Sequence, residues 1–485
     1  MAEAKYHSEI MQCREDSNKF VERCFRDAET GDFFKQEWFH REIQDAIMDE
    51  SRSDEVIMLP RSHGKSSQLE AAAIWLLGNN PNLRIKIVCE SDGRAMERLS
   101  SISQHITTNE RVQEVFPHLR PARREKWTQH KIIIQRDRIM RDASIEALGV
   151  LSGATGGRAD VLLPDDAVGF RNAIVHPKLR ETVKMKWDAD WCNLLEPNGR
   201  TFWFCTPWHV SDCTHMLLAN PSYNVVKIPV GTEHDPFEPL WEYRWPRERL
   251  QARKRKIGEM EYNRAFRLVA LSGEYACVQE KWISYWEEPP DVARLRIFVA
   301  FDVSSGEARD YFACVVLGVD PSAFQIYVLD AWHAMLTFLG RAEAVEREAR
   351  RWQPDVLGIE QENMKSLQQY LQETTLLNIV PLRPTLPKQV RLMGITPYLE
   401  RGQVLFNPAL RPESIANREE HGDLVTELTE FPLGANDDLV DAFVHDMSLA
   451  TAYGVTDDLV GEVGVDVSVI GGAIVEPTLA RLFDT

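Results

Sequence analysis

In the first half of the chain, short runs rich in apolar residues alternate with stretches in which apolar residues follow helical spacing. The runs occupy 56–59, 85–89, 132–134, 144–148, 161–163 and 201–205. Helical spacing returns between several of them, at 68–77, 95–106 and 177–194. Short apolar runs indicate buried strands, and their alternation with helices is typical of a parallel sheet covered by helices. The pattern therefore predicts an α/β domain with a mostly parallel sheet.

A different pattern starts near residue 296. Three strand-like runs follow in quick succession and are joined by short turn-rich segments, at 297–302, 311–319 and 325–332. A helical stretch, a further strand-like run and three more helical stretches come next, at 340–352, 356–359, 364–373, 389–400 and 438–450. This order predicts a second α/β domain that opens with antiparallel hairpins.

The 485 residues are too many for one hydrophobic core. The region between the two patterns differs from both because it contains prolines, aromatic residues and a basic stretch. The last part of the chain contains several glycines and is typical of a loose tail. We therefore expect an N-terminal domain at 1–225 with a helical first segment, a connecting region at 226–293, a second domain at 294–455 and a tail at 456–485.

The turn that joins the first strand-like run to its helix carries Gly64-Lys65-Ser66. Backbone N–H groups at a helix N-terminus bind phosphates, a lysine reaches the β- and γ-phosphate oxygens, and a hydroxyl binds Mg²⁺. The first glycine of the usual motif would fall at Leu59, so a chance tripeptide is the alternative. The strand–turn–helix setting favours an ATP site. Its candidate residues are Arg61, Ser62, His63, Gly64, Lys65, Ser66 and Ser67.

An acidic pair about 100 residues later supplies the other half of such a site. Asp165 follows an apolar run and would hold one Mg²⁺ together with Ser66, while Asp166 would orient the attacking water. A simple turn is the alternative, because Pro164 is unusual for a central strand. The two motifs together, in this order, predict nucleotide binding.

Three further residues fit an ATP site. Thr206 ends the run at 201–205, where it would sense the γ-phosphate. Arg158 lies in a glycine-rich turn before the acidic pair and would act as an arginine finger toward a neighbouring subunit. Gln36 is a candidate contact for adenine. The alternative for Arg158 is an ordinary surface arginine.

The second domain carries acidic residues at the ends of predicted strands and at the start of its last helix. Hard carboxylate oxygens suit Mg²⁺ or Mn²⁺, and two such ions about 4 Å apart serve phosphodiester cleavage. The candidate catalytic and metal-binding residues are Asp302, Glu360, Asp437, Asp438 and Asp441. Helix capping is the alternative for the aspartates at 437–441. Asp310 is a secondary candidate.

Composition limits the function classes. The net charge of −18 argues against a general electrostatic coat on DNA, although basic stretches lie near residues 120–126 and 247–256. The eight cysteines form no C-x-x-C pair, which favours buried free thiols over a zinc site. No apolar run is long enough for a membrane span and the N-terminus lacks a signal-peptide core, so we expect a cytosolic protein.

The order of these motifs resembles that of the large terminase subunits of tailed bacteriophages, over about residues 33–450. Pro60-Arg61-Ser62-His63-Gly64-Lys65-Ser66 is similar to the family's phosphate loop, in which the first glycine is often missing. The pair Asp165-Asp166 resembles the Walker B acid and its neighbour, although many relatives have Asp-Glu. Thr206 matches the coupling motif. Asp302, Glu360 and the stretch Asn436-Asp437-Asp438-x-x-Asp441-Ala442 resemble the three nuclease acids, and which of Asp437, Asp438 and Asp441 binds metal directly stays open.

This resemblance implies an ASCE-type P-loop ATPase domain followed by an RNase H-like nuclease domain. It further implies a DNA-packaging motor that acts on double-stranded DNA in the host cytoplasm, with ATP, one Mg²⁺ at the nucleotide and two Mg²⁺ or Mn²⁺ at the nuclease. The implied partners are a portal protein on the procapsid and a small terminase subunit. The resemblance also implies a homo-oligomeric ring on the capsid. For the isolated chain, a monomer stays an alternative.

Two other functions compete with this one. A helicase-nuclease of repair or restriction would need a second motor domain, for which the chain is too short. The other is a nucleic-acid-binding ATPase whose nuclease scaffold no longer cuts. Cleavage of supercoiled plasmid in the presence of Mn²⁺ distinguishes a cutting protein from such a scaffold.

Overall fold

The computed structural model describes residues 2–27, 30–122, 127–152, 156–271, 277–303, 311–415, 423–432 and 437–453. The chain forms two compact units, one of residues 1–254 and 260–272 and the other of residues 255–259 and 273–485. Each unit has one seven-stranded sheet in which most neighbouring strands are parallel. The expected α/β fold class is therefore confirmed. The expected tail at 456–485 lies outside the described residues.

The sheet of the N-terminal unit has the strand order β3-β4-β2-β5-β6-β1-β7. Its strands are β1 (Asp54–Met58), β2 (Ile85–Cys89), β3 (Lys131–Ile132), β4 (Ile145–Gly149), β5 (Ala159–Asp165), β6 (Leu195–Cys205) and β7 (Asn224–Lys227). Only the β3–β4 pair is antiparallel among these described strands. Because β6 lies between β1 and β5, the chain segments that leave these three strands emerge side by side at one edge.

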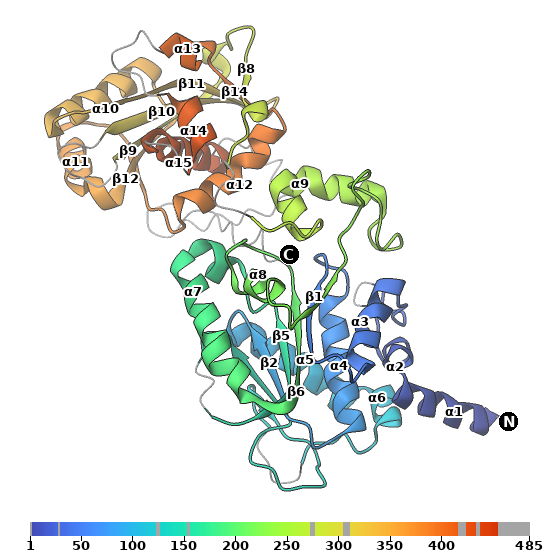
Figure 1. The fold of residues 1–485 in the computed structure, drawn as a ribbon. Coiled ribbons are helices and arrows are strands. Elements are labelled where there is room, and N and C mark those ends of the chain that lie inside the picture. The colour runs from blue at the N-terminus through green and yellow to red at the C-terminus, as the bar shows by residue number, and fades with distance from the viewer. Residues whose placement is uncertain are drawn as a thin grey trace. The chain divides into compact units, whose positions relative to one another are not determined.

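Helices cover both faces of this sheet (Figure 1). The helices up to the end of this unit are α1 (Ala2–Glu15), α2 (Ser17–Cys24), α3 (Trp38–Met48), α4 (Lys65–Asn79), α5 (Asp92–Thr108), α6 (Glu110–Val115), α7 (Pro177–Lys186), α8 (Cys213–Leu218) and α9 (Arg247–Ala265), of which residues 255–259 belong to the other unit. Alternation along β6 explains the two layers: Phe202 and Phe204 join the core that includes α4 and α5. Trp203 points the other way and packs against Trp187, just beyond α7, with ring centroids 4.6 Å apart.

The sheet of the C-terminal unit has the order β13-β12-β9-β10-β11-β14-β8. Its strands are β8 (Ser284–Tyr285), β9 (Arg296–Val303), β10 (Phe312–Asp320), β11 (Gln325–Ala334), β12 (Val356–Glu360), β13 (Ile379–Leu382) and β14 (Val404–Phe406). Strands β9, β10 and β11 form the expected antiparallel meander. Strand β12 pairs with β9 in parallel, with Ile359 opposite Phe301, so the next residue of each strand is a carboxylate at the same edge.

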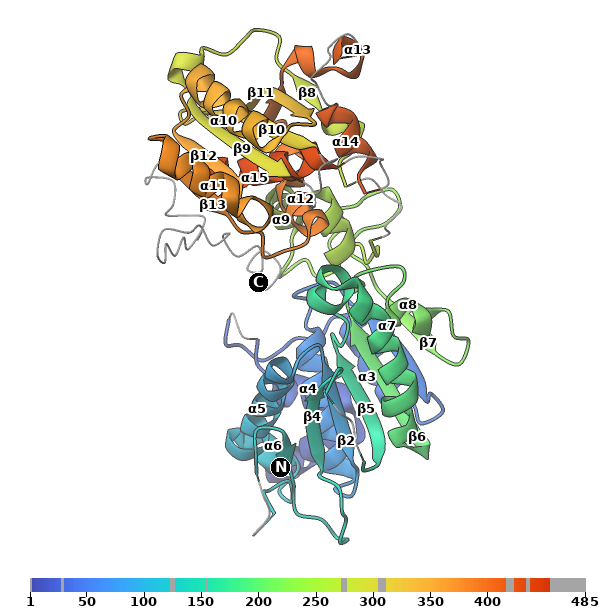
Figure 2. The same ribbon diagram turned by 90° about the vertical axis from the view of Figure 1, so that its left-hand side faces the viewer.

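The helices of this unit are α10 (Phe338–Trp352), α11 (Gln361–Thr374), α12 (Lys388–Glu400), α13 (Pro412–Ile415), α14 (Leu424–Glu430) and α15 (Asp438–Tyr453). Alternate residues of β9 point to two separate cores. Helices α10 and α11 cover one face, and α12, α14 and α15 cover the other, as Figure 2 shows. The unit is therefore a three-layer structure with its central strands buried on both faces.

Two boundaries differ from the expectation. The helix expected at 177–194 ends as an α-helix at Lys186 and continues as a π-helical turn, Trp187–Trp191. The region expected to be a connection, 226–293, is divided between the two units. In the described parts of the chain, no helix is both long and apolar enough to cross a membrane.

Gly78 tests the packing of α4. A Cβ atom on this helical glycine would lie 2.5 Å from the Phe116 ring. Although alanine favours helices over glycine, Gly78→Ala should destabilise the protein by about 1–3 kcal/mol because the core cannot accept the extra atom. The measurement is the midpoint of urea unfolding followed by circular dichroism. Gly93→Ala in α5 is the control, since its Cβ would meet nothing closer than 4.0 Å, and an equal effect of both changes would contradict this packing.

Candidate nucleotide and metal sites

The loop between β1 and α4 has the backbone shape of a phosphate-binding turn. Ser62 and Gly64 have φ values of 58° and 78°, in the left-handed region. Gly64 directly precedes α4, and a Cβ atom there would lie 2.8 Å from Nε2 of His40. Glycine is therefore required at this position for both conformation and space. The first N–H groups of α4 have no partners within the helix, which makes this end of α4 suitable for an anion.

Lys65, the first residue of α4, meets the ends of β5 and β6. Its ammonium forms an ion pair with Asp166 and lies 3.4 Å from Oγ1 of Thr206. The backbone N–H of Thr206 donates to the same carboxylate at 3.1 Å. Desolvation favours a raised pKa for Asp166, but Lys65 and Arg61 outweigh it and lower the pKa. Asp166 is therefore a carboxylate held in place by the phosphate-loop lysine.

Arg98 on α5 joins the two residues expected to bind Mg²⁺ at the nucleotide. Its Nη2 lies 2.8 Å from Oγ of Ser66 and 2.7 Å from Oδ2 of Asp165, and its Nη1 forms an ion pair with Glu70 on α4. Because both oxygens contact one nitrogen atom, they face the same small space. Oδ1 of the buried Asp165 has no hydrogen-bond partner among the described residues. Oxygen donors of this kind suit Mg²⁺.

Two other residues of the loop have structural contacts. The ring of His63 is buried, and its Nδ1 lies 2.8 Å from the carbonyl oxygen of Arg61. Burial lowers the pKa of His63 to about 4, so the ring is neutral at physiological pH. Burial, with Arg264 nearby, lowers the pKa of Arg61 to about 10, which still leaves Arg61 charged. Ser67 belongs to the first turn of α4.

Gln36 and Arg158 lie at different places in the N-terminal unit. The Gln36 amide is buried and donates to Oδ1 of Asn18 at 2.7 Å. Arg158 precedes β5 and is exposed; its N–H and its Nη1 donate to Asp142 and to the carbonyl of Asn193, each at 3.2 Å.

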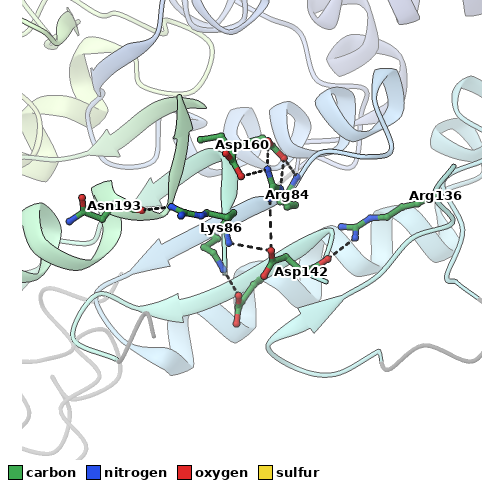
Figure 3. A network of polar contacts seen from close by, with 9 residues as sticks. Arg84, Lys86, Arg136, Asp142, Asp160 and Asn193 are labelled. Carbon is green, nitrogen blue, oxygen red and sulfur yellow. Dashed lines mark hydrogen bonds and ion pairs between the residues drawn. The ribbon is translucent and has the colours of Figure 1, made fainter. Parts of the chain in front are cut away.

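Figure 3 shows the network of polar contacts around Asp142, to which the backbone N–H of Arg158 donates. In it, Arg84 contacts Asp160 at 2.8 Å and faces Asp142 at 3.9 Å. Arg158 directly precedes the seven-residue strand β5, and Asp165 is the last residue of that strand, so the strand puts roughly 20 Å between the two at about 3.3 Å per residue. Arg158 therefore lies far from Lys65 of its own chain.

The C-terminal unit brings Asp302 and Glu360 together at the edge where β9 and β12 end. His445 of α15 joins them, and one donor atom from each of the three residues lies within 4.8 Å of the others. All three side chains are buried. Burial raises the pKa of Asp302 well above its usual range, and the neighbouring carboxyl groups of Glu360 and Asp441 raise it further. The cluster is therefore a place where a cation would stabilise the charged carboxylates.

The three aspartates at the start of α15 have different surroundings. Asp441 forms ion pairs with Lys388 at 2.6 Å and with Arg391 at 2.7 Å, both on α12. Asp437 lies 2.9 Å from the same Lys388. Asp438 is buried. Two cations thus already neutralise Asp441, whereas its neighbour on the next helical turn, His445, faces Asp302.

The structure bears in part on the alternative that these aspartates cap α15. Glu427 of α14 accepts the N–H of Leu439, in the first turn of α15, at 2.9 Å. Burial raises the pKa of Glu427 to about 7. A glutamate from another helix therefore caps part of α15. Asp310 and Asn436 lie outside the described residues.

Sequence reasoning did not include Arg98, Lys388, Arg391 or His445. The signal for His445 is its spacing of four from Asp441, which puts both residues on one face of α15. Arg98 has a weaker signal, as an arginine on the helix that follows β2. Lys388 and Arg391 approach the acids only through the packing of α12 on α15, which no local pattern predicts.

Comparison with known families agrees with this geometry in the second unit. Residues 299–449 match the model of the family described as Terminase RNaseH-like domain. These residues form a terminase RNase H-like domain. Asp302, Glu360, Asp438 and His445 all lie within it. The resemblance to large terminases is therefore confirmed for this part of the chain. No curated protein matches the chain.

Solved structures of large terminases resemble the chain more remotely. The large terminase of a thermophilic bacteriophage is 11% identical, with a TM-score of 0.45 over 86% of this chain and 99% of that one. That of bacteriophage HK97 is 12% identical, with a TM-score of 0.40 over 89% and 98%. The ATPase domain of the Thermus phage P74-26 large terminase, a mutant, is 14% identical, with a TM-score of 0.35 over 49% and 95%. These likenesses are too distant to carry an argument about function.

The position of Arg98 leads to a prediction about Mg²⁺. Arg98→Ala leaves Glu70 and Asp165 buried without their cation, which should destabilise the protein by about 3 kcal/mol. Because Ser66 and Asp165 then have no competing guanidinium, Mg²⁺ should raise the melting temperature of the variant more than that of the wild type. The measurement is thermal unfolding without nucleotide, with and without Mg²⁺.

Arg94→Ala is the matched control on the same helix. Arg94 is about half exposed and lies 3.8 Å from Glu90, so its removal should also lower stability but leave the Mg²⁺ response unchanged. Identical Mg²⁺ responses of the Arg98 variant and the wild type would contradict the idea that Arg98 occupies the cation position.

Proposed function

We propose that the chain is a phage DNA-packaging motor, which uses ATP to move double-stranded DNA into procapsids and cuts concatemeric DNA with a metal-dependent nuclease. The observation that carries the proposal is the presence of two separate sites on one chain. A phosphate-loop lysine meets an acidic strand end in one unit, and the terminase RNase H-like domain holds a carboxylate cluster in the other.

In the proposed ATPase, the turn at 61–64 and the N-terminus of α4 bind the phosphates through backbone N–H groups. Lys65 contacts the β- and γ-phosphate oxygens and exchanges Asp166 for them. The freed Asp166 then orients the water that attacks the γ-phosphate, and Thr206 reports on the γ-phosphate through its hydrogen bond to Asp166. Ser66 and Asp165 would hold Mg²⁺, which neutralises phosphate charge when bound.

The roles of Arg158 and Gln36 complete this proposal. Because Arg158 lies at the far end of β5 from the nucleotide site, it would reach only the site of a neighbouring subunit, as an arginine finger does. Gln36 remains the candidate contact for adenine, through the amide oxygen that has no partner among the described residues.

In the proposed nuclease, Asp302 and Glu360 would hold divalent metal together with an acidic residue of α15, for which Asp438 is the buried candidate. Bound ions of this type generate the attacking hydroxide and stabilise the leaving oxygen. Lys388 and Arg391 hold the carboxylate of Asp441 in place beside the cluster through ion pairs. Mg²⁺ and Mn²⁺ both suit carboxylate ligands.

The same proposal includes partners and place of action. The motor would act in the host cytoplasm as a ring on the portal of the procapsid, with a small terminase subunit selecting the DNA. A helicase-nuclease would need a second motor domain, whereas the second unit contains an RNase H-like domain instead. A scaffold that no longer cuts would lack a reason to bury Asp302 and Glu360 side by side.

Separate inactivation of the two sites tests the proposal. Lys65→Ala should lower ATP turnover by about 100-fold or more while plasmid cleavage with Mn²⁺ continues, because the lysine stabilises phosphate charge only. Asp302→Asn, which keeps the size of the side chain, should abolish cleavage and leave ATP turnover unchanged. Phosphate release and nicking of supercoiled plasmid are the two measurements.

Each variant is the folding control for the other, since each should keep one activity. Loss of both activities in both variants would show damage to the fold rather than to a site. Cleavage by Asp302→Asn at the wild-type rate would exclude the proposed nuclease site.

A further inference from the structure

His445 lies in the carboxylate cluster of the C-terminal unit without a hydrogen bond to it. Its Nε2 is 3.9 Å from Oδ1 of Asp302, too far for a hydrogen bond. Oδ1 has no hydrogen-bond partner among the described residues, although Asp302 is only 2% exposed. A buried carboxylate oxygen without a partner is costly. A ligand bound by both Nε2 of His445 and Oδ1 of Asp302 would give this oxygen a partner.

The separation of the donor atoms fits a shared metal ion. Two atoms that each bind one ion at about 2.1 Å lie at most about 4.2 Å apart. The distance of 3.9 Å between Nε2 and Oδ1 is within this limit, and Glu360 offers a third donor atom within 4.8 Å of both. Donor atoms from β9, β12 and α15 thus gather in one small space.

Asp441 is less suited to be the ligand from α15. Its two carboxylate oxygens are each engaged by a cation, Oδ2 by Lys388 and Oδ1 by Arg391. Metal binding would have to break two ion pairs that are largely buried.

Arg391 does not engage the ring nitrogens of His445 as it engages the carboxylate of Asp441. Its Nη1 lies 3.4 Å from Nε2 and 3.5 Å from Nδ1 of His445. A group almost equidistant from both ring nitrogens is not directed along the lone pair of either. His445 can therefore offer a nitrogen lone pair to an ion, while Arg391 continues to hold Asp441.

We propose that His445, rather than Asp441, supplies a nitrogen ligand from α15 to the ion bound by Asp302 and Glu360, in addition to the acidic α15 ligand for which Asp438 is the candidate. The inference rests on the proposed nuclease site and adds its ligand set. Lys388 and Arg391 then have a positioning role: they fix Asp441 and so the helical turn that presents His445.

Pulsed electron paramagnetic resonance of Mn²⁺ bound to the full chain tests this ligand directly, in the absence of nucleotide. The wild type should show coupling of Mn²⁺ to ¹⁴N, and histidine labelled with ¹⁵N should replace that coupling with a ¹⁵N signal. In His445→Gln the coupling should vanish, and the Kd for Mn²⁺ should rise by about 10- to 100-fold. Asp441→Asn is the matched control from the same helix face and should keep the coupling.

The outcomes separate this inference from the proposed function. Mn²⁺ that binds the wild type and is released by Asp302→Asn, but shows no histidine coupling, overturns the role of His445 and leaves the nuclease site standing. The same holds if the coupling persists in His445→Gln, or if only Asp441→Asn weakens binding. If the protein shows no Mn²⁺ binding that depends on Asp302, the proposed nuclease site itself is wrong. The isotope measurement on the wild type needs no substitution, so it remains decisive if a variant fails to fold.

Discussion

Parallel pairing of neighbouring strands is the constraint on which both sites depend. When strands run in the same direction, their C-terminal ends meet at one edge, and the residues that follow them become neighbours. Strand β6 between β1 and β5 thereby brings Thr206, Lys65 and Asp166 together. The pairing of β12 with β9 does the same for Glu360 and Asp302. Hydrogen bonds of the sheets thus bring together residues that follow strands from distant parts of the chain.

Lysine and arginine side chains lie beside the acidic residues at both sheet edges. Arg98 contacts Asp165 and Ser66, Lys65 contacts Asp166, and Lys388 contacts Asp441. Buried carboxylates need such partners, because an unpaired charge in the interior is expensive. At the first edge, Lys65 and Arg61 lower the pKa of Asp166, so this carboxylate is ionised before any ligand arrives. Ligand binding then becomes an exchange of one positive group for another, at a smaller desolvation cost than binding to an empty site.

Much of this architecture could be predicted from the sequence because it depends on local patterns. Apolar runs mark β1, β2 and β5, and the acids that follow a run must lie at a strand end. The strand order could not be predicted, since nothing local places β6 between β1 and β5. For the same reason Arg98 and His445 were not predicted as site residues. Each reaches its site from a helix, through packing that joins residues far apart in sequence. The division of residues 226–293 between the two units was not predicted either, because proline-rich and aromatic segments can pack on either unit.

The placement of Arg158 at the opposite end of β5 from Asp165 has a consequence for assembly. If the guanidinium of one copy serves the nucleotide of the next, the two contacting surfaces are different faces of the same fold. Such a head-to-tail contact excludes a two-fold symmetric dimer and gives every copy the same polarity. A closed circle of these contacts leaves no terminal copy, so each nucleotide is completed by a neighbour.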